Sequence, residues 1–113
     1  MTLFLERIKP SNLVTRFDKN LAPHEFVFLT EKSIVDEFEY NTSQQVYITK
    51  NSWQNIVDSK NAMQKMLRDT YENLNSNASL EDYKTVFLMN YMNGEDFIGE
   101  TMEQLRKEIL LVT

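Results

Sequence analysis

Apolar residues recur at helical spacing through the second half of the chain. Between residues 52 and 75 they recur at intervals that match one or two helical turns: Trp53, Ile56, Val57, Met63, Leu67, Tyr71 and Leu74. A helix has about 3.6 residues per turn, so this spacing lines them up on one face. Ser52 can cap the first turn, and the polar segment 75–79 ends the pattern. The pattern therefore predicts a long amphipathic helix.

Two more helices are predicted after this one. Ser79 and Asp82 have the spacing of a capping box, and apolar residues follow them up to the stop signal Asn93-Gly94. A last helix, from about residue 96 to residue 112, carries a stripe formed by Ile98, Met102, Leu105, Ile109 and Val112. Glu95, Asp96 and Glu100 lie near its N-terminus, and Arg106 and Lys107 lie nearer its C-terminus, as the helix dipole favours.

The first half of the chain has weaker signals. Residues 2–9 fit either a strand or the start of a helix, and Pro10 ends the segment. Ser11 can then cap a short helix. Residues 25–30 and 45–49 are rich in β-branched and aromatic residues, which predicts two strands.

Residues 33–40 allow two interpretations. Phe38 and Tyr40 alternate with Glu37 and Glu39, which is typical of a strand, but Ile34 and its neighbours also fit one face of a helix. We favour the strand, because a hairpin through residues 41–44 would give residues 45–49 a pairing partner. The predicted fold is then α+β in a single domain, residues 1–113. A short N-terminal helix and a small antiparallel sheet of two or three strands precede three C-terminal helices, and the helix that begins near Trp53 covers the sheet.

The composition excludes several kinds of chemistry. The chain has no cysteine, so it can form neither disulfides nor thiolate zinc sites nor a cysteine nucleophile. His24 is the single histidine, and no catalytic or metal-binding spacing accompanies it. We therefore expect no catalytic residue, no metal and no cofactor, and we expect that the protein is not an enzyme. The alternative is an enzyme built on the carboxylates of Glu37 and Glu39.

Charge and hydropathy indicate the compartment and the class of partner. The N-terminus resembles no signal peptide and no apolar run approaches the roughly 18 residues of a membrane span, so we expect a cytoplasmic protein without a membrane partner. A net charge of -5 argues against nucleic acid. Four basic residues near the N-terminus keep a nucleic-acid binder open as an alternative: Arg7, Lys9, Arg16 and Lys19.

The helix at residues 80–92 is apolar on nearly every side, which is typical of a buried helix or of an interface. Methionines usually fill cores, but Met89 and Met92 lie on faces that the core need not use. We therefore predict an apolar docking patch rimmed by acidic residues, with these partner-binding residues: Tyr83, Phe87, Met89, Tyr91, Met92, Glu37 and Glu39.

The predicted function is that of a small interaction module, such as an inhibitor, an immunity factor or a regulatory adaptor. It would bind a protein partner or a second copy of itself as a homodimer. Two alternatives remain, an acidic mimic of nucleic-acid charge and a structural subunit of a homo-oligomer.

Overall fold

The chain folds as helices alone in the part that the computed structural model describes, which is residues 2–17, 20–42 and 48–112. The helices are α1 (Thr2–Arg7), α2 (Pro10–Leu13), α3 (Pro23–Tyr40), α4 (Lys50–Glu72), α5 (Leu80–Asn93) and α6 (Phe97–Val112). These residues contain no strand. The predicted α+β fold with an antiparallel sheet is therefore wrong.

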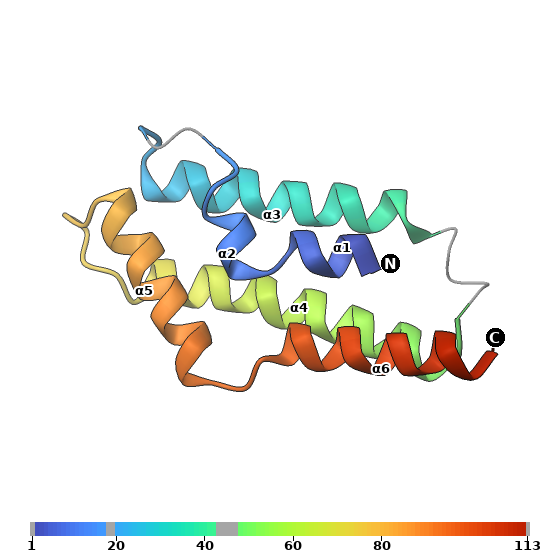
Figure 1. The fold of residues 1–113 in the computed structure, drawn as a ribbon. Coiled ribbons are helices and arrows are strands. Elements are labelled where there is room, and N and C mark those ends of the chain that lie inside the picture. The colour runs from blue at the N-terminus through green and yellow to red at the C-terminus, as the bar shows by residue number, and fades with distance from the viewer. Residues whose placement is uncertain (1, 18–19, 43–47, 113) are drawn as a thin grey trace.

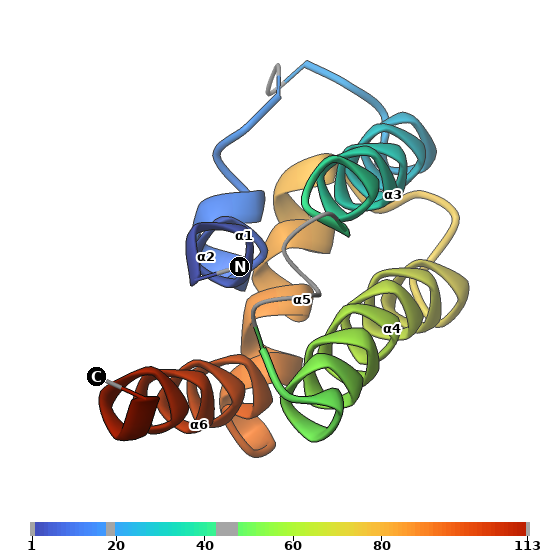
Figure 2. The ribbon, with the colours of Figure 1, turned by 90° about the vertical axis from the view of Figure 1, so that its right-hand side faces the viewer.

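The three longest helices, α3, α4 and α6, run roughly along the long axis of the molecule, and α4 packs against both α3 and α6 (Figure 1). The short α1 lies between α3 and α6 and contacts α6, and Figure 2 shows these four helices end-on around a shared interior. At the other end, α5 crosses obliquely and packs against α2, α3 and α4 (Figure 1). The result is a bundle whose far end is closed by α5.

Residues 25–30 and 33–40, which were predicted as two strands, form the helix α3 instead. Residues 43–44 of the predicted hairpin loop lie outside the described residues. The buried residues of α3, Phe26, Val27, Thr30 and Ile34, recur at helical spacing and face the core. Pro23 occupies the first turn, where its missing N–H costs nothing, and the Glu25 carboxylate accepts a hydrogen bond from the Ala22 N–H at 3.0 Å. The β-branched and aromatic residues favoured a strand, but helical burial against α4 and α5 outweighs that preference. The third predicted strand covered residues 45–49. Residues 45–47 lie outside the described residues, and residues 48–49 precede α4 and form no β-strand.

Aromatic rings connect the helices through the core. The Phe38 ring packs against Phe4 at a centroid distance of 5.7 Å and against Trp53 at 5.2 Å, which joins α1, α3 and α4. Near α5, the Tyr83 ring contacts Phe26 at 5.7 Å and stacks on Phe87. Such rings bury large apolar areas and pair favourably in offset or edge-on geometry, so they stabilise the bundle.

Sequence signals at helix ends have mixed outcomes. The Ser79–Asp82 capping box is confirmed, with the Ser79 hydroxyl accepting from the Asp82 N–H at 3.2 Å. Helix α4 begins slightly earlier than predicted, because Thr49 and not Ser52 is its N-cap. Likewise, Lys9 and not Ser11 precedes α2, whose first residue is Pro10.

Candidate docking surface

The outer face of α5 exposes three large apolar side chains. Met92 is 78% exposed, Met89 55% and Val86 37%. They lie on the side of α5 that points away from the core, and we call them the α5 outer face. The segment that carries them, residues 85–94, contains no charged residue. An exposed apolar patch of this kind is a feature of interaction sites.

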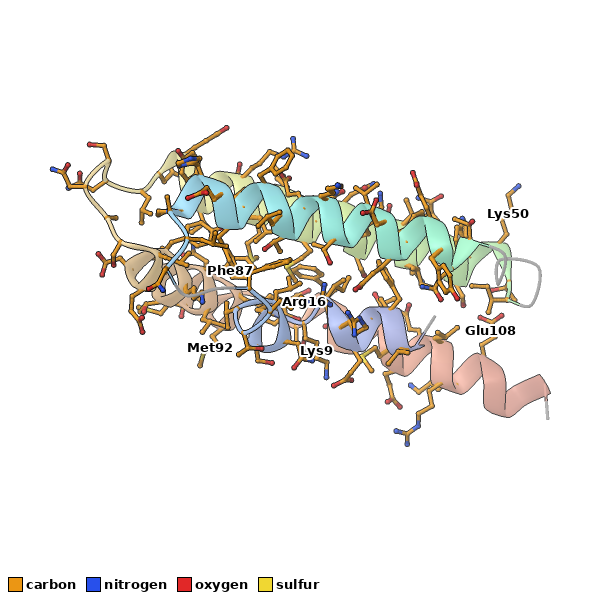
Figure 3. All side chains as sticks on the ribbon, turned by 90° about the horizontal axis from the view of Figure 1, so that it is seen from above. Lys9, Arg16, Lys50, Phe87, Met92 and Glu108 are labelled. Atoms are coloured by element: carbon orange, nitrogen blue, oxygen red, sulfur yellow. The ribbon has the colours of Figure 1, made fainter. Side chains whose placement is uncertain are left out.

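The opposite face of α5 fills the core. Tyr83 and Phe87 are fully buried, and the Tyr83 hydroxyl donates a hydrogen bond to the Leu67 carbonyl at 2.8 Å. Burial raises the pKa of this phenol. Figure 3 shows Phe87 within the bundle and Met92 pointing outward. The structure thus divides the predicted patch, with Met89 and Met92 on the surface and Tyr83 and Phe87 inside.

Tyr91 belongs to the joint between α5 and α6. Its half-buried hydroxyl donates a hydrogen bond to the Asp96 carboxylate and accepts one from the Ile98 N–H at 3.3 Å. Burial and the bond to Asp96 raise the pKa of Tyr91. Asp96 also accepts from the Gly99 N–H at 3.0 Å, and these contacts lower the pKa of the carboxyl. Tyr91 therefore orients α6 on α5.

Glu37 and Glu39 do not form a pair of carboxylates. In a helix, residues two apart point to nearly opposite sides, so the two acids diverge. Arg7 binds Glu37 at 2.6 Å and Arg16 binds it at 3.3 Å, whereas Glu39 is exposed. Arg16 also donates to the Ser33 hydroxyl and to the Arg7 carbonyl, both at 2.7 Å. Glu37 thus fastens the N-terminal segment to α3.

The basic residues near the N-terminus form ion pairs with acidic residues of the same chain. Arg7 and Arg16 share Glu37, and Lys9 lies 3.6 Å from Glu6. Lys19 falls outside the described residues. The described cations of this segment therefore have acidic neighbours within the chain.

A second apolar surface lies between α1 and α3. An open groove there is lined by Leu3, Phe4, Arg7, Asp36, Glu37, Tyr40 and Asn41. Leu3 is 72% exposed and Tyr40 84% exposed, so both side chains are available at the rim. Three charged residues, Arg7, Asp36 and Glu37, also line this groove.

Sequence reasoning missed the role of Glu108. Its carboxylate accepts hydrogen bonds from the backbone N–H and the hydroxyl of Thr49, the residue that caps α4. Hydrogen bonds from Ser52 and Thr49 hold the pKa of Glu108 below its usual value. This contact spans 59 positions of the chain, so no local pattern could have indicated it.

The described residues contain no group of three or more histidines and carboxylates arranged to hold a metal ion. His24 is exposed in the first turn of α3, beside an opening between α3 and the end of α4. In the part of the chain with described coordinates, no helix has both the length and the apolar character needed to cross a membrane.

Fold and surface together define a small helical protein that exposes an apolar face on α5. A family described as "Family of unknown function (DUF7935)" matches residues 1–112, so the chain belongs to that family. Neither the curated proteins nor the solved structures contain a match to this chain.

Proposed function

We propose that this protein is a non-enzymatic interaction module that docks the α5 outer face onto a protein partner, as an inhibitor, immunity factor or regulatory adaptor does. One observation carries the proposal: α5 has apolar residues on two opposite faces, and only the face with Tyr83 and Phe87 is buried in the core of the protein. Exposing Met89 and Met92 to water has a free-energy cost that docking would remove. The cysteine-free composition fits a reducing compartment, and we place this activity in the cytoplasm.

The other candidate functions draw less support from the arrangement of charges. Mimicry of nucleic-acid charge needs free carboxylates, yet Glu37 binds two arginines and Glu31 pairs with Arg68 at 2.8 Å. Asp96 and Glu108 are engaged at helix ends. A nucleic-acid site in the basic segment would have to separate Arg7 and Arg16 from Glu37. Apolar docking requires no such rearrangement.

The proposal is tested by capture of partners from a lysate of the source cells, with the salt concentration varied. Met89→Asp places a charge in the middle of the α5 outer face and should reduce capture at least tenfold. Phe28→Asp is the matched control, because Phe28 is 67% exposed and belongs to α3 and not to α5. Capture that falls equally in both variants, or in neither, would contradict the proposal. Apolar docking should also persist as salt rises, whereas charge mimicry should not.

A separate variant checks that the two faces of α5 have different roles. Phe87→Ala should lower the free energy of unfolding by about 3–5 kcal/mol, because it opens a cavity in the core. Met89→Asp should change that free energy by less than about 1 kcal/mol, since its side chain is largely exposed. Loss of capture in Met89→Asp would then reflect the surface and not unfolding.

A further inference from the structure

We propose that Asn93 is a self-modification site, where the backbone nitrogen of Gly94 converts the side-chain amide of Asn93 to a carboxylate. The new charge then weakens docking at the α5 outer face. This second step rests on the proposed docking function, whereas the modification itself does not. Asn93 is the last residue of α5, and Gly94 begins the short connection to α6 at the edge of the molecule (Figure 1).

The reaction uses only these two residues and water. The Gly94 nitrogen loses its proton and attacks the carbonyl carbon of the Asn93 side chain. A carbon–nitrogen bond forms, the bond from this carbon to the amide nitrogen breaks, and that nitrogen leaves as ammonia with the proton that Gly94 lost. Water then opens the five-membered imide ring at either carbonyl. One product is aspartate, and the other is isoaspartate, in which the chain continues through the side-chain carboxyl.

Sequence and exposure favour this reaction at Asn93. Of all the asparagines in the chain, Asn93 alone is followed by glycine, whose backbone moves freely because it has no Cβ. Both residues are exposed to solvent. The Gly94 N–H donates one hydrogen bond, to the Tyr91 carbonyl at 3.2 Å, and bonds at a helix end open readily. Asn90, by contrast, lies inside α5, and its amide donates to the Thr70 hydroxyl at 3.3 Å.

The fold does not require glycine at position 94. Its backbone has a φ of -104° and a ψ of -169°, a conformation open to residues that have side chains. An added Cβ would lie 3.8 Å from the Asn90 carbonyl oxygen and 3.9 Å from that of Tyr91, which are ordinary contacts. Gly94→Ala should therefore keep the fold and slow the attack, because the methyl group crowds the nitrogen.

The product places a charge where the α5 outer face has none. Residues 85–94 contain no charged residue, and Asn93 follows Met89 by four positions, so the two side chains share one face of the helix. A carboxylate at position 93 adds negative charge to a chain whose net charge is already -5. An apolar partner that covers this face would have to remove the carboxylate from water, so its affinity should fall.

Peptide mapping of the aged protein tests the modification. The full-length chain is incubated near neutral pH, and mass spectrometry follows the conversion of each asparagine. Asn93 should convert at least tenfold faster than Asn77, which is exposed between α4 and α5 but is followed by alanine. Gly94→Ala should slow conversion of Asn93 at least fivefold. Equal rates at Asn93 and Asn77, or an unchanged rate in Gly94→Ala, would overturn the inference.

Partner capture from lysate tests the effect of the new charge. Asn93→Asp, which carries one of the two products from the start, should lower capture at least fivefold, and aged wild-type protein should behave alike. Asn77→Asp is the matched control, because it adds the same charge outside the α5 outer face. Full capture of Asn93→Asp, with capture lost in Met89→Asp, would refute the effect and leave the docking function standing. Full capture of Met89→Asp as well would refute docking, and conversion of Asn93 would then be decided by its rate alone.

Discussion

The guanidinium of Arg16 lies 3.3 Å from the carboxylate of Glu37, and its side chain is only 13% exposed. Arg16 follows α2 in the chain and Glu37 lies in the last turn of α3, so this ion pair fixes the N-terminal segment on α3. Burial lowers the pKa of Arg16, while the nearby carboxylate opposes that shift. Each of these two partly buried charges therefore offsets the cost of removing the other from water.

Removing this carboxylate should destabilise the bundle. Glu37→Ala leaves Arg16 without its counter-charge, and we expect the free energy of unfolding in urea to fall by about 1–3 kcal/mol. Glu39→Ala is the matched control, because the same change two positions away removes an exposed side chain and should cost less than about 0.5 kcal/mol. Equal losses in the two variants would refute the structural role of Glu37.

Gly99 and Asp96 should show strong coupling in a double-mutant cycle. A Cβ at Gly99 would collide with the Asp96 carboxylate that caps α6. Gly99→Ala should therefore destabilise the natural protein, despite the higher helix propensity of alanine. In an Asp96→Ala background the obstacle is gone, and the same change should stabilise by about 0.5–1 kcal/mol. Chemical denaturation of the four proteins measures this reversal of sign, and additive effects would contradict it.

Acid should weaken the helix ends held by Asp96 and Glu108. Hydrogen bonds place the pKa of each carboxyl below its ordinary value, 3.8 for Asp96 and 4.5 for Glu108. Stabilisation by a group with a lowered pKa is complete above the ordinary value and is lost as the pH falls through the folded-state value. The free energy of unfolding should thus decrease from about pH 4.5 downward. Asp96→Asn and Glu108→Gln should each flatten this decrease, and an unchanged slope in both would contradict the assignment.

Thr30 and Thr101 are both buried but should respond oppositely to valine. Among the described side chains, the buried Thr30 hydroxyl has no hydrogen-bond partner. Thr30→Val removes this unsatisfied group at equal shape and should stabilise by up to about 1 kcal/mol. The Thr101 hydroxyl lies 2.6 Å from the Ser59 hydroxyl. Thr101→Val leaves the buried Ser59 hydroxyl without this hydrogen-bond partner and should lower the free energy of unfolding by about 1–3 kcal/mol. Thermal unfolding distinguishes the two.

The sequence predicted the C-terminal half of the fold well. Apolar periodicity and local capping residues located α4, α5 and α6, because these signals act within a few residues of each helix. It failed over residues 25–40, where Phe26, Val27 and Phe28 have strand-favouring side chains and the hairpin supplied a plausible partner for residues 45–49. Phe26, Thr30 and Ile34 are buried at helical spacing. This burial results from contacts with α4 and α5, which are distant in the sequence, so local patterns could not show that the segment is a helix.

The candidate surface was predicted in part for the same reason. Helical geometry alone separates Met89 from Phe87, yet which side of α5 meets the core depends on its packing against α2, α3 and α4. The partners of Glu37 and Glu108 lie 21 to 59 positions away in the chain, so their structural use could not be read from local spacing.

Methionine oxidation tests the account most directly, because it reports on the α5 outer face in the unmodified protein. Under dilute hydrogen peroxide, mass spectrometry should find Met92 and Met89 converted to sulfoxide quickly and the buried Met63 slowly. In the associated state, whether with a second copy or another protein, Met89 and Met92 should become protected while the partly buried Met102 keeps its rate. Unchanged oxidation of Met89 and Met92 in a complex that has formed would contradict the claim that α5 is the docking surface.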